Sequence, residues 1–182
     1  MDRRRPELTR RGLLLGAAGV AAGWLLRPHP ALAGSSALTD VARRALAESP
    51  LVYISPLKSD GAESQCHGEV WFVTDGDDVL LVTARDRWRS RAVERGLTRA
   101  RIWAGDFGVW SRNRGAWTKG PSFDARAGFE RDPAAHAKAL ASFGRKYPDE
   151  WDEWGPRFEK GLADGSRVMV RYRPAPASDE KG

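Results

Sequence analysis

The sequence predicts a mainly β, α+β fold in which a small antiparallel barrel of about six strands is surrounded by short helices. Three observations support this prediction. Short runs of β-branched and aromatic residues recur along the chain, turns containing glycine and aspartate separate several of them, and only brief segments space their apolar residues as helices do. The length of 182 residues fits a single domain with additions at its ends.

Caps and stops mark the helical segments. Thr39 and Asp132 are N-cap candidates, Pro50 stops the first helix, and glycines at 96 and 155 end two later ones. The helices are predicted over residues 39–48, 85–95, 133–144 and 147–154.

The strand segments either alternate polar with apolar residues or are wholly apolar. The run 79–83 is almost entirely apolar, as expected for a strand that is buried on both faces. A turn containing Gly76 joins it to the preceding strand. The predicted strands are 51–57, 69–74, 79–83, 100–104, 107–111 and 166–172.

Composition excludes several classes of protein. With one cysteine the chain cannot form an internal disulfide framework or a cysteine-rich metal site, and three histidines leave little room for a multi-histidine centre. We therefore expect no bound metal. The net charge of +6 is uneven, because residues 1–33 hold six basic and two acidic residues and the remainder is only +2. Such a balanced remainder predicts no nucleic-acid partner.

The first 33 residues are predicted to be an export signal. An arginine-rich start precedes an apolar run over residues 13–26, and Ala31 and Ala33 form an A-x-A site for cleavage after Ala33. Arg10 and Arg11 stand just before the run, a pattern typical of substrates of the twin-arginine export machinery. The mature protein is then periplasmic or secreted. The alternative is an uncleaved N-terminal helix that anchors the protein to a membrane.

The chain divides into four parts on this basis. Residues 1–33 are the export signal, residues 34–50 an N-terminal helix, residues 51–173 the barrel, and residues 174–182 a disordered tail. The tryptophans of the barrel part are mostly predicted to fill the core, because aromatic side chains dominate core packing. The alternative is stacking on a sugar or base. These tryptophans are Trp71, Trp103, Trp110, Trp117, Trp151 and Trp154.

A set of weak motifs follows a fixed order over residues 50–112. They are the strand at 52–54, a turn at Gly61, Glu69-Val70-Trp71-Phe72, the hairpin Asp75-Gly76-Asp77, an apolar strand ending in Thr83, and Trp88-Arg89 in a basic helix. In this order the motifs resemble the pyridoxamine 5'-phosphate oxidase-like superfamily of FMN- or deazaflavin-binding proteins. The resemblance implies a six-stranded antiparallel split β-barrel that forms a homodimer, with the flavin in a groove at the dimer interface.

The resemblance also implies which residues bind the cofactor. Residues of the second strand would face the isoalloxazine ring, and the threonine that ends the third strand would hold the phosphate together with the arginines after it. Hydroxyl and guanidinium groups suit a phosphate dianion because they donate several hydrogen bonds to it. The alternative for some of these arginines is a solvated helix face. The ring-facing residues are Val70, Trp71 and Phe72, and the phosphate-binding residues are Thr83, Arg85, Arg89 and Arg91.

Two functions stay open at this point. The first is an exported FMN- or deazaflavin-dependent oxidoreductase of a small substrate, in which the cofactor carries the redox chemistry. No catalytic residue is identified, although His67 and Tyr53 are candidate proton donors. The second is a non-catalytic split barrel that holds a cofactor, haem or another small ligand. One departure from the superfamily supports this second function, since Trp88-Arg89-Ser90-Arg91 stands where Ser-x-Lys is usual, but the oxidoreductase remains the preferred interpretation.

Overall fold

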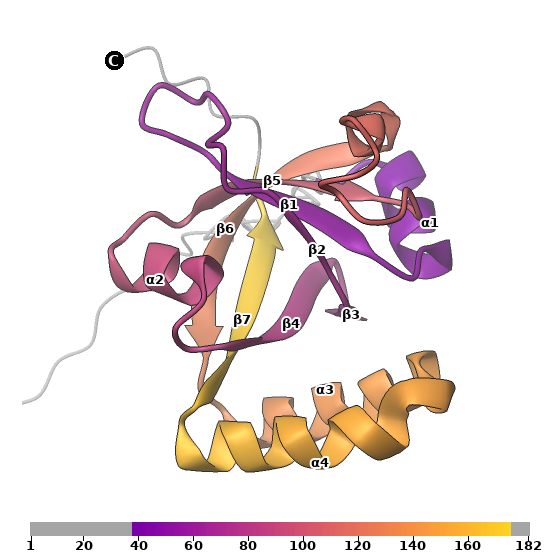
Figure 1. Ribbon diagram of the computed structural model, residues 1–182, viewed down its shortest axis with the longest axis vertical. Helices are drawn as coiled ribbons and strands as arrows, with labels where there is room; N and C mark the ends of the chain where they lie inside the picture. The colour runs from indigo at the N-terminus through magenta and orange to yellow at the C-terminus, as the bar shows by residue number, and fades with distance from the viewer. Residues whose placement is uncertain (1–37, 176–182) are drawn as a thin grey trace, which may run out of the picture. The chain divides into compact units, whose positions relative to one another are not determined.

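The computed structural model describes residues 38–175. The predicted export signal, with Arg10, Arg11 and the cleavage site after Ala33, lies outside the described residues, as does the tail from residue 176. The described part of the chain forms four helices, a short 3-10 helix and seven strands (Figure 1). In chain order these are α1 (Asp40–Glu48), β1 (Val52–Pro56), β2 (Gly68–Val70), β3 (Val73–Asp75), β4 (Asp78–Ala84), α2 (Trp88–Glu94), β5 (Arg99–Ala104), η1 (Ala116–Lys119), β6 (Ser122–Glu130), α3 (Pro133–Lys146), α4 (Pro148–Asp164) and β7 (Arg167–Pro174).

The two edges of the sheet come from consecutive strands. All seven strands form one antiparallel sheet in the order β2-β1-β5-β6-β7-β4-β3, so that β2 and β3 are its edges. Only Trp71 and Phe72 separate these strands in the sequence, and the sheet therefore curls until its edges meet there. The result is a curled half-barrel with four helices (Figure 1), which confirms the predicted α+β class.

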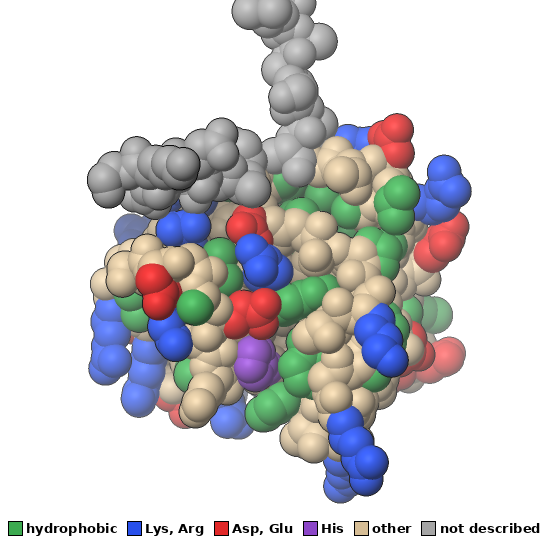
Figure 2. All heavy atoms as spheres, turned by 90° about the horizontal axis from the view of Figure 1, so that it is seen from above, with side chains coloured by type: hydrophobic (Ala, Val, Ile, Leu, Met, Phe, Trp, Pro, Cys, Tyr) green, Lys and Arg blue, Asp and Glu red, His purple; other side chains and the backbone are tan. Residues whose placement is uncertain are grey.

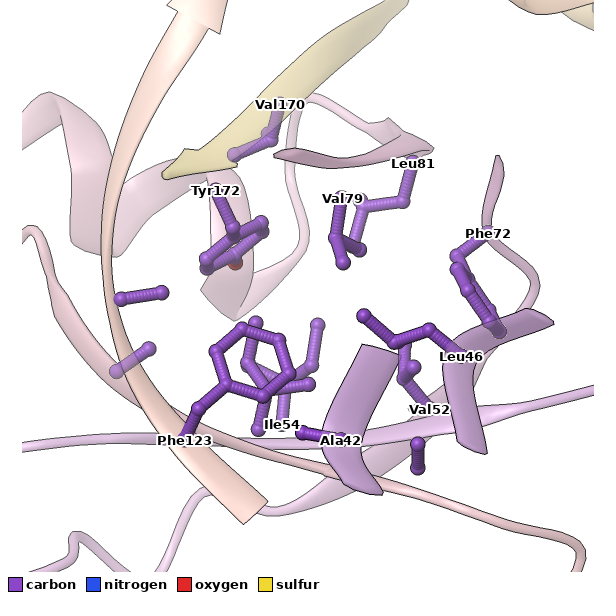
Figure 3. Close-up of a cluster of buried hydrophobic side chains, with 14 of the residues drawn as sticks. Ala42, Leu46, Val52, Ile54, Phe72, Val79, Leu81, Phe123, Val170 and Tyr172 are labelled. Atoms are coloured by element: carbon purple, nitrogen blue, oxygen red, sulfur yellow. The ribbon is translucent and has the colours of Figure 1, made fainter. Parts of the chain in front are cut away.

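β4 is buried on both faces, as its apolar sequence predicts. Val79 and Leu81 belong to the main core inside the curled sheet, where Leu46 of α1 also packs (Figure 3). Leu80 and Val82 belong to a second core, which they share with α3 and α4. These two helices lie side by side along one side of the sheet (Figure 1) and contact β3 and β7.

The hydroxyl group of Tyr147 holds the point where the two sheet edges meet. It accepts a hydrogen bond from the amide of Phe72 at 2.9 Å. It also lies 2.9 Å from the carbonyl oxygens of Phe72 and Pro50, and can donate its single proton to one of them. The Tyr147 ring stacks on Trp71, with ring centroids 4.6 Å apart. Burial raises the pKa of Tyr147, so the phenol stays neutral and keeps its proton for donation.

Two of the predicted strands differ from the structure. The strand predicted over residues 69–74 is interrupted, because the chain leaves one edge of the sheet as β2 and enters the other as β3. The strand predicted over residues 107–111 is wrong, since this segment is a loop. The Tyr53 hydroxyl fixes that loop by accepting a hydrogen bond from the Phe107 amide and donating one to the Gly108 carbonyl.

β6 is missing from the six predicted strands. Its sequence alternates polar and apolar residues along its whole length, but aspartate, glycine and two alanines give it a low β-propensity. Hydrogen bonds to β5 on one side and β7 on the other hold it in the middle of the sheet. The alternation is therefore a signal for this strand that the sequence prediction misses, and pairing on both sides outweighs the low propensity of its residues.

α4 continues beyond the predicted helix 147–154. It ends only at Asp164, although Gly155 and Pro156 lie inside it. Trp154 and Phe158 on its apolar face pack into the second core. A Cβ atom at position 155 would lie 2.8 Å from the Trp151 ring, so glycine is needed for this close packing. Tertiary packing thus outweighs the helix-breaking tendency of these two residues.

A buried arginine, Arg171 of β7, ties several elements together. Its guanidinium contacts the carboxylates of Asp75, Asp78 and Glu130 at 3.0, 2.9 and 2.7 Å. Lys138 of α3 lies 2.6 Å from Asp75, and its hydrogen bond, followed by that of Arg171, lowers the pKa of Asp75. A backbone N–H just before α3 lowers the pKa of Glu130, and Arg171 lowers it further. The carboxylates of Asp75 and Glu130 are thereby held in their charged form.

We expect Tyr147→Phe to destabilise the fold by about 1–3 kcal/mol, because the variant leaves a buried peptide group of Phe72 without a hydrogen-bond partner. Urea unfolding followed by tryptophan fluorescence measures the free energy of unfolding. Tyr172→Phe is the matched control, since Tyr172 is also buried and its hydroxyl makes no hydrogen bond within the described part of the chain. Equal losses in the two variants would contradict the role of Tyr147.

We expect Arg171→Met to cost about 3–5 kcal/mol at neutral pH, because three carboxylates lose their buried counter-ion. In the parent, folding lowers the pKa of Asp75 and of Glu130, whose ordinary values are 3.8 and 4.5. The resulting stabilisation is complete at pH values above these ordinary values. It is lost as the pH falls through the lower pKa values of the folded state. The difference in free energy of unfolding between parent and variant should therefore become smaller at acid pH. Urea unfolding at several pH values measures it.

The control for this prediction is Arg157→Met, which removes an exposed pair with Glu153 and should change stability by no more than about 0.5 kcal/mol. If the difference in free energy of unfolding between the parent and Arg171→Met stays constant down to acid pH, the charge network is not its cause.

Candidate functional site

A cavity of about 420 Å³ lies beside β2, the end of β4 and the start of α2. We name it the Arg89 cavity after the arginine described below. Six segments of the chain form its walls. They are residues 67–70, 82–84 and 87–89 together with Trp110, Trp154 and Arg167.

Three of the predicted cofactor-binding residues meet at this cavity. Val70 comes from the end of β2, Thr83 from the end of β4, and Arg89 from α2. Thr83 lines the cavity from the end of β4, together with its neighbours Val82 and Ala84. The fold therefore brings a hydroxyl, a guanidinium and an apolar side chain together from three elements.

The other predicted residues lie elsewhere. Trp71 stacks on Tyr147 in the second core, and Phe72 is fully buried in the main core. Arg85 donates to the Gly165 carbonyl at 2.8 Å and pairs with Glu94, outside the Arg89 cavity. Arg91 is exposed on α2 and does not line the cavity. Of the two candidate proton donors, His67 lines the cavity and Tyr53 does not.

Arg89 is enclosed without a carboxylate partner in the described part of the chain. Its Nη2 donates to the Glu69 carbonyl oxygen at 3.1 Å, whereas its buried Nε has no hydrogen-bond partner. Its guanidinium carbon lies 4.6 Å from the centre of the Trp88 ring. Gly68 allows the close approach, because any Cβ atom there would collide with Nη2. Burial lowers the pKa of Arg89, which shows that the charge is desolvated and poorly compensated.

Two further arginines line the same cavity. Arg167 lies over the rings of Trp154 and Phe158, at 5.7 and 5.4 Å from their centroids. Neither it nor Arg87 forms an ion pair with any residue between 38 and 175. One carboxylate, that of Glu69, lines the cavity, and it accepts a hydrogen bond from the Trp110 amide at 3.2 Å. Three guanidinium groups therefore face one carboxylate, and the cavity favours an anion.

Aromatic rings form another part of the wall. Trp88, Trp110 and Trp154 line the cavity, and the His67 ring lies 6.0 Å from Trp110 and 5.5 Å from Trp117. The Nδ1 atom of His67 is buried without a hydrogen-bond partner. Flat apolar faces next to guanidinium groups suit a ligand that combines an aromatic ring with an anionic group.

Sequence reasoning placed Trp110 and Trp154 in the core and did not include Arg167. Trp154 does pack in the second core, but both rings also line the cavity. Arg167 begins β7, far along the chain from α2, which ends at Glu94, and no local pattern connects it with the phosphate-binding motif. Only the pairing of β4 with β7, which sets Ala84 opposite Arg167, brings it there.

Two other large cavities lie in the described part of the chain, one of about 740 Å³ along α3 and α4 and one of about 480 Å³ beside the end of β6. Figure 2 shows a face on which basic and acidic side chains are interspersed. Among residues 38–175, no group of three or more His, Cys, Asp or Glu side chains is placed to bind a metal ion. Within the same residues, no helix is long and apolar enough to cross a membrane.

The sequence matches no protein-family model and no curated protein. Solved structures do match. HutZ, the heme storage protein of Vibrio cholerae, is 14% identical, with a TM-score of 0.51 over 74% of this chain and 88% of HutZ. The conserved hypothetical protein Rv2991 of Mycobacterium tuberculosis is 17% identical, with a TM-score of 0.50 over 80% of this chain and 94% of that protein. Campylobacter jejuni ChuZ is 9% identical, with a TM-score of 0.51 over 72% of this chain and 50% of ChuZ.

The chain has a split-barrel fold. This is the architecture that the motifs at residues 50–112 implied. At identities this low the likeness concerns the fold alone. The function therefore has to be argued from the residues of this chain's own site.

We expect Arg89→Met to be at least as stable as the parent in anion-free buffer, because the substitution removes a buried charge that has no carboxylate partner. Inorganic phosphate at about 100 times its Kd should stabilise the parent by about 2.7 kcal/mol and the variant by clearly less. Thermal unfolding with and without phosphate measures both. Arg95→Met, at an exposed arginine outside the cavity, is the control and should behave as the parent. A large loss of stability in anion-free Arg89→Met would mean that the protein itself neutralises the guanidinium.

Proposed function

We propose that this chain is an exported flavin-dependent oxidoreductase of the pyridoxamine 5'-phosphate oxidase-like type, with FMN or a deazaflavin as cofactor and a small molecule as substrate. The observation that carries the proposal is the enclosed guanidinium of Arg89, whose Nε has no partner and which faces a cavity walled by tryptophans. A phosphate group would pair with this guanidinium through charge-assisted hydrogen bonds.

The residues present fit a flavin. The cavity volume of about 420 Å³ falls within the roughly 300–1,000 Å³ of most small-molecule sites. Thr83, Arg87 and Arg89 can donate to a phosphate, and the indole rings of Trp88 and Trp110 offer flat faces to an aromatic ring system. A bound flavin or deazaflavin would supply hydride transfer. The chain's own contribution would be to hold the phosphate, to place the ring and to exclude water from it.

His67 is the one candidate proton donor at the cavity, since Tyr53 is engaged with the loop after β5. With its Nδ1 atom buried, the His67 ring can exchange a proton with a bound molecule only through Nε2. In this proposal it is the group that would move a proton to or from the substrate.

The proposal includes export and dimerisation. Arg10 and Arg11, directly ahead of an apolar run, support export by the twin-arginine machinery to the periplasm or the cell exterior, with a membrane anchor if the signal stays uncleaved. The homodimer is proposed because the motifs at residues 50–112 resemble those of a superfamily whose members form dimers.

A second candidate is a split barrel that binds an anionic ligand without turnover. The positions of Trp71 and Phe72 favour it, because two of the three residues expected to face the flavin ring are engaged in the two cores instead. The same cavity would then serve for binding alone.

Visible absorption and native mass spectrometry of the full chain, purified from a host that makes both FMN and a deazaflavin, test the proposal. We expect a bound flavin that is retained in Arg95→Met. Arg89→Met should bind it about 10- to 100-fold more weakly, the cost of about 1.5–3 kcal/mol for a hydrogen bond to a charged group. A folded, colourless protein that binds neither cofactor on titration excludes the flavoenzyme. Tight flavin binding without reduction by any electron donor favours the second candidate.

A further inference from the structure

Lys146, the last residue of α3, carries an amine that no carboxylate or carbonyl of the described residues pairs. Its Nζ atom lies 3.3 Å from the centre of the Phe72 ring and 5.6 Å from that of Tyr147. It forms no hydrogen bond or ion pair with any residue between 38 and 175. Lys138 of the same helix, by contrast, lies 2.6 Å from Asp75. The Lys146 amine therefore rests on aromatic rings where the two sheet edges meet.

The fold holds the amine in this position. Phe72 connects β2 with β3 and is fully buried, and the Tyr147 hydroxyl binds the same connection. Lys146 directly precedes Tyr147, and its side chain lies over the Phe72 ring. The Lys146 side chain is only partly buried. A molecule from solvent can therefore reach the amine, although the aromatic rings exclude much of its hydration.

Burial lowers the pKa of Lys146 from the ordinary value of 10.5 to about 8, and no charged side chain of the described residues lies close enough to offset this effect. Tyr147 is the titratable group against which the amine lies, and its buried phenol is neutral. Ring faces attract an ammonium ion, but they replace only part of the hydration that the charge loses. A far larger share of this amine than of an ordinary lysine is thus uncharged at neutral pH.

We propose that Lys146 is a site of covalent acylation, at which the amine of the folded protein attacks an activated acyl donor. Donors of this class are acyl phosphates and thioesters. The amine nitrogen forms a bond to the carbonyl carbon, and the bond from that carbon to the phosphate oxygen or to the sulfur breaks with its electron pair. The departing phosphate or thiolate takes up the amine proton, which leaves an amide on Lys146.

Two chemical properties favour this reaction at Lys146. An uncharged lysine amine in apolar surroundings is an activated nucleophile. The amide that forms carries no charge, so the reaction also removes a charge whose burial is unfavourable. The inference goes beyond the proposed function and does not depend on it, because Lys146 does not line the Arg89 cavity.

The chain contains a matched lysine for comparison. Lys160 lies on α4, the other helix of the α3–α4 hairpin. Its side chain is exposed, and it forms no ion pair with any described residue. Lys160 therefore reports the reactivity of a hydrated amine in the same protein.

The test treats the folded full chain at about pH 7.5 with limiting acetyl phosphate, and in parallel with acetyl-CoA, and locates acetyl-lysine by peptide mass spectrometry. At this pH the uncharged fraction of an amine with a pKa of about 8 is roughly two hundred times that of an ordinary lysine. We expect Lys146 to react at least about tenfold faster than Lys160, which allows for the lower intrinsic reactivity of a less basic amine. In concentrated urea, where the fold is lost, the two rates should become similar. Reaction with one donor alone identifies the source of the acyl group.

Two variants assign the reaction to its amine. Lys146→Arg keeps a cation beside the Phe72 ring and should lose the fast acetylation, whereas Lys160→Arg should keep it. The α-amino group of the chain, whose ordinary pKa also lies near 8, is distinguished from Lys146 by its peptide. If Lys146 of the folded chain reacts no faster than Lys160 with either donor, the inference is wrong, whether or not the protein binds a flavin.

Discussion

The structure depends on one topological constraint, that the two edges of the sheet are consecutive strands. β2 and β3 lie at opposite ends of the strand order, yet only two residues connect them. In a flat sheet the two edge strands would lie too far apart for a connection of two residues. The sheet therefore curls, and its main core lies inside the curl. The peptide groups of the connection cannot join a strand ladder there, and the Tyr147 hydroxyl supplies the hydrogen bonds that they would otherwise lack. The α3–α4 hairpin is thereby fastened to the point where the edges meet.

The same constraint creates the candidate site. Because β2 is short and ends at the meeting point of the edges, the space between it and the end of β4 is not filled by another strand. Arg89 enters that space from α2, and Arg167 enters it from β7. Other arginines of the sheet are matched with carboxylates, as Arg171 is with three of them and Arg101 with Asp124. In the cavity, Arg87, Arg89 and Arg167 form no ion pair with any described residue, which is the electrostatic basis for an anionic ligand.

The sequence predicts those parts of the fold whose own residues determine them. β4 is apolar on both faces and is identified without its neighbours, and the first helix begins after its Thr39 cap as expected. β6 is not predicted although its polar and apolar residues alternate, because its aspartate, glycine and alanines have low β-propensity and pairing on both sides stabilises the strand. In the site, Thr83 and Arg89 follow from a local motif. Arg167 could not be predicted, because its position depends on the register between β4 and β7.

The central claim is that Arg89 binds an anion. Side-chain ¹H–¹⁵N NMR of arginine Nε groups tests it most directly, with the Arg89 signal assigned by its absence in Arg89→Met. Since the Nε–H of Arg89 is buried without a partner, an anion in the cavity should give it one. The account predicts that this signal shifts and becomes protected from exchange when FMN or inorganic phosphate is added, and that the signal of Arg95 does not. An Arg89 Nε signal that is unchanged by both anions would contradict the account.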